Sequence, residues 1–127
     1  MPSKKLETFS KHNPKLAPLV QRLEEHMRWL VGQRISEVIP RVAAAQLGIS
    51  EADTLGLLTL FQNAGLVKPR YDLVCKPTSS VVGSFYSLDD VPDRVECQFC
   101  GKDHDADDLR VDLVFELSHE RASNAAA

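Results

Sequence analysis

The sequence predicts an α+β protein with a helical first half and a strand-rich second half. Apolar residues in segments 19–31 and 55–61 recur at the three- and four-residue spacing of amphipathic helices. Beyond Gly65 the pattern changes, and every second residue of Leu109–Leu117 is apolar, as in a strand with one buried face. Length and composition (127 residues, 43% hydrophobic) allow one proper core, or one small core with a minor lobe.

The composition also indicates in which cellular compartment the protein is expected. No apolar run approaches the roughly 20 residues that span a bilayer, and the first fifteen residues lack the apolar stretch of a secretory signal. The chain has three cysteines, and an odd number argues against a secreted disulfide scaffold. We therefore expect a cytoplasmic protein that does not bind membranes.

The segment 38–71 carries the strongest local signals. Pro40 suits the first turn of a helix, and Gly48 ends that helix. Ser50 is a typical N-cap for a second helix, which Gly65 terminates. A helix, a tight turn, a second helix and then a strand is the plan of a winged helix-turn-helix.

The rest of the chain divides around this segment. We expect a flexible N-terminus in residues 1–15, because little in it promises burial. Residues 16–74 hold an amphipathic N-terminal helix, a short strand near Val38 and the winged helix-turn-helix. Residues 75–117 form a small C-terminal β lobe like a zinc ribbon, and residues 118–127 a disordered tail.

Cys97-x-x-Cys100-Gly101 has the most chemical content. Two thiolates at this spacing, followed by glycine, form a knuckle that binds zinc when two further ligands are near. Cys75 is the third candidate, and Thr78 stands where a second C-x-x-C would have its other cysteine. His104 is the best fourth ligand. Weaker candidates are Asp103, Asp105 and His119.

Two other interpretations of the cysteines stay open. The three thiols could pack as small apolar groups in a ribbon without metal, or form a redox-active pair. A catalytic zinc is disfavoured, because the nearby acids lie in an open polar loop. The same loop, residues 102–108, lacks the glycine and closing glutamate of an EF-hand and is predicted to be solvated.

This combination resembles small bacterial proteins of multi-gene defence and conflict systems. It is also similar to the N-terminal arrangement of archaeal TFE and eukaryotic TFIIE-alpha transcription factors. The resemblance spans roughly residues 38–117, and it is carried by segments 44–50, 63–66, 71–77, 87–92 and 97–101. It implies an accessory or adaptor module rather than an enzyme.

DNA binding is the alternative function. Residues 1–48 carry a net charge of about +4 and the remainder about −7, so only one part of the chain would attract nucleic acid. Glu51 and Asp53 begin the helix that would enter the groove, and carboxylates there repel phosphate. The candidate DNA contacts are Arg34, Arg41, Lys68 and Arg70.

A protein partner is the favoured function. No motif for phosphate binding, a hydrolase nucleophile or a metalloprotease is present, so we expect no enzyme activity. The N-terminal helix offers an apolar surface for a partner or for a homodimer. Its predicted interface residues are Leu23, Met27, Trp29 and Leu30.

Overall fold

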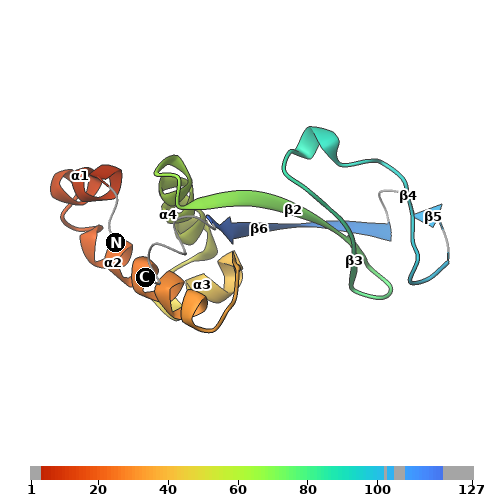
Figure 1. Cartoon of the computed structure of the whole chain (residues 1–127), viewed down its shortest axis with the longest axis horizontal. Coiled ribbons are helices and arrows are strands. Elements are labelled where there is room, and N and C mark those ends of the chain that lie inside the picture. The colour runs from red at the N-terminus through yellow and green to blue at the C-terminus, as the bar shows by residue number, and fades with distance from the viewer. Residues whose placement is uncertain (1–3, 102, 105–107, 119–127) are drawn as a thin grey trace. The chain divides into compact units, whose positions relative to one another are not determined.

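The protein has an α+β fold, as the sequence predicts (Figure 1). A computed structural model describes residues 4–101, 103–104 and 108–118. In this part of the chain the helices precede most of the strands, and the main sheet has four strands. None of the described helices combines the length and the apolar character that a bilayer crossing requires.

The segment predicted as a flexible N-terminus contains a helix, α1 (Lys4–His12). Leu6 is only 1% exposed in it, and the Lys5 Nζ donates a hydrogen bond of 2.9 Å to the Asn63 carbonyl. Burial of one leucine and this long-range bond dock the helix, although the segment alone is polar. This corrects the expectation for residues 4–12; residues 1–3 lie outside the described part.

Helix α2 (Ala17–Gly32) confirms the amphipathic helix, but not the surface assigned to it. Leu23 is 0% exposed and Leu30 6%, so both belong to the core and are not available to a partner. The reason is that they lie on the same stripe as Val20, which packs against the rest of the helical unit. Of the predicted interface residues, Met27 is half-buried and Trp29 is exposed.

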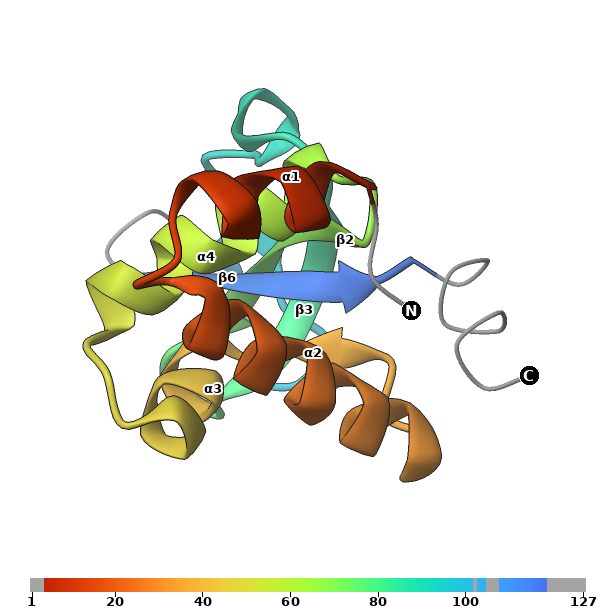
Figure 2. The same ribbon diagram turned by 90° about the vertical axis from the view of Figure 1, so that its left-hand side faces the viewer.

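The two central helices follow their capping signals. Helix α3 (Pro40–Leu47) begins with Pro40 and ends at Gly48, which has a left-handed φ of 70°. Helix α4 (Glu51–Asn63) begins after Ser50, whose side chain accepts a 3.0 Å hydrogen bond from the Asp53 backbone N–H. Figure 2 shows these helices with α1 and α2 around the end of β6.

The main sheet has the strand order β1–β6–β2–β3. Its strands are β1 (Glu37–Val38), β2 (Val67–Cys75), β3 (Ser80–Phe85) and β6 (Leu109–Leu117). β1 pairs antiparallel with β6, with Val38 opposite Phe115. β2 pairs antiparallel with β3, with Leu73 opposite Gly83 and a bulge between Leu73 and Val74. The short strand near Val38 therefore forms where the sequence predicts it.

The chain divides into two compact units with boundaries that differ from the predicted ones. They are Met1–Lys68 with Phe115–Ala127, and Pro69–Val114. The last strand returns to the helical unit because Phe115 pairs with Val38 and the Leu117 N–H donates 2.8 Å to the Ser36 carbonyl. The β unit contains most of β2 and most of β6, and its bounds differ from those of the predicted lobe 75–117. Of the predicted tail 118–127, only Ser118 lies within the described residues.

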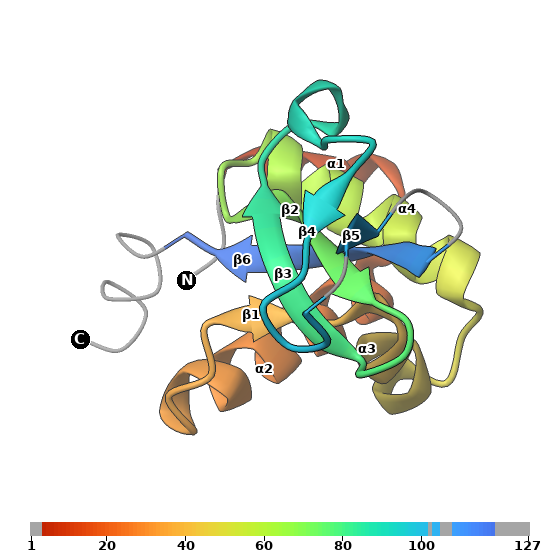
Figure 3. The ribbon, with the colours of Figure 1, turned by 90° about the vertical axis from the view of Figure 1, so that its right-hand side faces the viewer.

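The β unit contains three small elements besides its strands of the main sheet (Figure 3). These are a 3₁₀ turn, η1 (Leu88–Asp90), and the strands β4 (Val95–Glu96) and β5 (Asp103–His104). Ser87 caps η1, accepting a 3.3 Å hydrogen bond from the Asp89 N–H. β4 and β5 pair antiparallel, with Val95 opposite His104. This pairing brings the two ends of the segment 95–104 together.

Candidate metal centre

Four potential metal ligands converge within the β unit. Cys75 ends β2, Cys97 follows β4, Cys100 lies in the next turn and His104 ends β5. Their ligand atoms all lie within 4.8 Å of one another. Cys75, Cys97 and His104 are buried and Cys100 is half-buried. These are the four ligands that the sequence predicts, and they form one group that could hold a metal ion.

Two of the distances between donor atoms are shorter than those of a tetrahedral zinc site. The His104 Nε2 lies 3.2 Å from the Cys75 Sγ and 2.7 Å from the Cys100 Sγ. Around a tetrahedral zinc ion, sulfur and nitrogen ligands stand about 3.5–3.8 Å apart. Side-chain shifts of about 1 Å or less would open the group to that size. Three thiolates and one imidazole are a donor set that zinc prefers.

Backbone geometry shapes the knuckle around Cys97. Gly101, with a φ of 69°, donates its N–H to the Cys97 carbonyl at 2.9 Å and closes the turn. Burial raises the pKa of the Cys97 thiol, but hydrogen bonds from the backbone N–H groups of Cys100 and Phe99 and from the thiols of Cys100 and Cys75 together outweigh it, so the pKa is lowered overall. These hydrogen bonds favour the thiolate, which is the metal-binding form.

A carboxylate lies behind the histidine. The His104 Nδ1 is 3.5 Å from the Asp108 Oδ2, while the Nε2 of the same ring faces the sulfurs. The Asp108 carbonyl also accepts a 3.0 Å hydrogen bond from the Lys76 backbone N–H, next to Cys75. A carboxylate in this place fixes the tautomer and the orientation of a metal-binding histidine. Sequence analysis missed this role of Asp108, although its spacing of four residues from His104 was a signal.

The other sequence candidates are not part of the group. Thr78 is exposed. It lies in the turn before β3, where the Ser79 N–H donates a 2.7 Å hydrogen bond to the Cys75 carbonyl. Asp105 and His119 lie outside the described residues, as does the side chain of Asp103. Among the described residues, Cys75, Cys97, Cys100 and His104 are the one set that could hold a metal.

The candidate DNA contacts are distributed over both units. Arg34, Arg41 and Lys68 are exposed in the helical unit. Arg70 belongs to the β unit, where its guanidinium forms two hydrogen bonds of 2.8 and 2.9 Å with the Asp72 carboxylate. Because this carboxylate balances its charge, Arg70 is poorly suited to bind phosphate.

Comparison with protein-family models, with curated proteins and with solved structures finds no match for this chain. No relative supplies a function.

Proposed function

We propose that this chain is a non-enzymatic adaptor that binds another protein, built from a winged helix with a zinc-stabilised β unit. The observation that carries the proposal is the closed set of four protein ligands, three of them buried. Structural zinc sites use four protein ligands, whereas catalytic sites keep a position for water or substrate. The centre is therefore suited to hold the β unit together rather than to perform chemistry.

The sheet topology supports the winged-helix assignment. The helix-turn-helix of α3 and α4 lies between a short strand and a hairpin, as in the plan predicted from the sequence. The first strand, β1, pairs with β6, which is the returning strand of that hairpin. The β unit contains most of β2 and β6 and the chain between them, at the place in the sequence where a winged helix has its wing.

An adaptor agrees with the resemblance to accessory proteins of bacterial multi-gene defence systems. It also agrees with the exposed apolar side chains of the β unit. Phe99 in the knuckle is 59% exposed and Leu88 in η1 58%. Exposed aromatic and aliphatic groups on a rigid module are typical anchors of protein interfaces.

The second candidate function is DNA binding. It is supported by the helix-turn-helix and by exposed Arg34 and Arg41. Two observations weaken it. Glu51 and Asp53 are exposed in the first turn of α4, where they would face phosphates. Arg70 is paired with Asp72.

Metal content tests the structural half of the proposal. We expect one zinc per chain in the purified protein by elemental analysis, lost in Cys97→Ser and retained in Thr78→Ala, the matched control at an exposed position. Wild-type protein without zinc, even after refolding with the metal, would overturn the zinc assignment.

Binding assays test the functional half. We expect zinc-loaded protein to form a stoichiometric complex with a protein encoded near its gene, and to show no salt-sensitive affinity for mixed duplex DNA in fluorescence anisotropy at low salt. Micromolar, salt-sensitive DNA binding that Arg34→Glu and Arg41→Glu abolish would replace the adaptor with a regulator.

A further inference from the structure

Trp29 is an exposed aromatic residue of α2. It is the chain's one tryptophan, and its side chain is 57% exposed on α2. Val20, Leu23 and Leu30 of the same helix are buried. Tryptophan is among the residues most enriched at the energetic centres of protein interfaces, so this exposed side chain is a candidate interface anchor.

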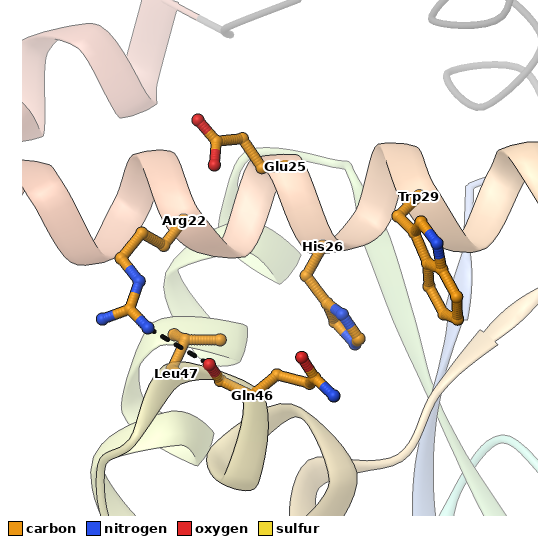
Figure 4. A pocket seen from close by; sticks show the side chains of 6 residues that line it. All are labelled: Arg22, Glu25, His26, Trp29, Gln46 and Leu47. Atoms are coloured by element: carbon orange, nitrogen blue, oxygen red, sulfur yellow. Dashed lines mark hydrogen bonds between the residues drawn. The ribbon is translucent and has the colours of Figure 1, made fainter.

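The tryptophan borders a groove between α2 and α3. Arg22, His26 and Trp29 lie along one face of α2 at a spacing of four and three residues. Figure 4 shows the Arg22 and His26 side chains directed toward the last turn of α3, with the Trp29 ring further along α2 beside that of His26. The groove has a volume of about 320 Å³, and its lining residues are Arg22, Glu25, His26, Trp29, Gln46 and Leu47. That is room enough for a large side chain.

We propose that this groove is the contact between two copies of the chain. α2 packs antiparallel on α2 of the second copy, about a two-fold axis between Glu25 and His26. Each Trp29 then lies in the groove of the other copy, over its Arg22. This dimer does not depend on the zinc centre or on the adaptor function.

The residue pattern is self-complementary under this symmetry. A two-fold axis between positions 25 and 26 places Arg22 opposite Trp29 of the second copy, twice in each dimer. It also places Glu25 within one turn of Arg28 of the second copy, and both side chains are exposed. A parallel arrangement would instead oppose Arg22 with itself. Opposite charges and a cation facing an aromatic ring therefore favour the antiparallel copy as the occupant.

Arg22 and Trp29, the two side chains that form the proposed contact, are each held in place within the single chain. The Arg22 Nη2 donates a 3.1 Å hydrogen bond to the Gln46 carbonyl, which holds the guanidinium at the edge of the groove. The Trp29 ring is nearly parallel to that of His26, with centroids 6.2 Å apart and planes at 15°. Burial lowers the pKa of His26 and favours its neutral form, so the groove gains no second cation there. Side chains that are already positioned lose less entropy on association.

The experiment uses the full zinc-loaded chain and two readouts. Light scattering after size exclusion measures the mass, which we expect to rise from 14.1 kDa to twice that value with concentration. Tryptophan emission reports on the contact itself, because Trp29 is the one indole. We expect a blue shift and weaker acrylamide quenching over the same concentration range.

Variants locate the contact. We expect Trp29→Ala to weaken the dimer by roughly thirty-fold or more, since each substitution occurs twice in a dimer. Leu88→Ala, which removes an equally exposed apolar side chain from the β unit, should leave the mass unchanged. Circular dichroism checks that both variants keep their helices.

A mixing experiment tests the symmetry. Neither Trp29→Ala nor Arg22→Ala alone retains an intact pair, but a mixed dimer of the two variants retains one. We therefore expect an equimolar mixture to form more dimer than either variant does by itself. A monomer at every concentration, or a dimer that Trp29→Ala leaves intact, would overturn the proposal. Failure of the mixture to recover dimer would overturn the antiparallel pairing.

Discussion

The His104 Nδ1 lies 3.5 Å from the Asp108 Oδ2, on the side of the ring that faces away from the cysteine sulfurs. A carboxylate in this position holds a histidine ligand in the tautomer that offers Nε2 to a metal. The relationship extends the centre beyond its four ligands, to a residue that would not bind zinc itself.

Asp108→Asn should therefore weaken zinc binding without abolishing it. We expect about a ten-fold loss of affinity, the lower end of the range for such supporting residues, measured by competition with a chromogenic chelator. Asp112→Asn is the matched control, because this carboxylate forms an ion pair with Arg110 at 2.9 Å and not with a metal ligand. Equal affinities of Asp108→Asn and wild type would show that the carboxylate does not support the site.

Removing the metal should affect the two units differently. Cys75, Cys97, Cys100 and His104 all belong to the unit Pro69–Val114. The helical unit has its own buried side chains, among them Leu23, Leu58 and Phe61, each 0% exposed. With excess chelator we expect the amide NMR signals of the β unit to collapse, while most helical ellipticity at 222 nm remains. Loss of the helices at the same chelator concentration would mean that the two units unfold together.

Asp72 gives the stability of the β unit a dependence on pH. Burial of this carboxyl raises its pKa, but hydrogen bonds from Arg70 and from the Ser84 hydroxyl, 2.8 Å from Oδ1, outweigh the burial and lower the pKa below its ordinary value of 3.8. The pairing therefore stabilises the fold above about pH 4 and is lost as the pH falls through the lowered pKa.

Comparison with Asp72→Asn isolates this contribution. We expect the variant to be less stable than wild type by about 1–2 kcal/mol at pH 7, from urea unfolding, and the difference to shrink below pH 4. Loss of zinc at low pH affects both proteins, so the difference between them cancels it. A difference that stays constant from pH 7 to pH 3 would exclude Asp72 as the source.

The sequence predicts best what depends on neighbouring residues. Pro40, Gly48 and Ser50 mark helix ends through local backbone chemistry. In the structure α3 begins at Pro40 and ends before Gly48, and α4 begins after Ser50. The ligands Cys97 and Cys100 follow from a short spacing in the same way. Such signals need no knowledge of the rest of the chain.

What the sequence did not predict depends on distant contacts. Helix α1 is docked by Leu6 and by a bond from Lys5 to a residue more than fifty positions away. The return of β6 to the helical unit requires Phe115 to pair with Val38. No periodic pattern encodes which strands pair, so the predicted lobe ends at Leu117, whereas the β unit ends within β6 at Val114.

Replacing either of two glycines with open surroundings by alanine should change the free energy of unfolding, with opposite signs at the two positions. A Cβ at Gly48 or at Gly56 would meet no heavy atom within 4 Å, so steric clash with other residues affects neither. Gly48 has a φ of 70°, a conformation that costs an alanine roughly 1–2 kcal/mol. Gly56 lies within α4, where alanine is favoured over glycine by about 0.5–1 kcal/mol.

We therefore expect Gly48→Ala to destabilise the helical unit and Gly56→Ala to stabilise it, by about 1 kcal/mol each, in urea unfolding followed at 222 nm. Each variant is the control for the other, since both add the same methyl group. If Gly48→Ala were neutral, the turn between α3 and α4 could not require the left-handed conformation that ends α3. If both variants were stabilising, the unfolded chain alone would explain the result, because alanine restricts it equally at both positions.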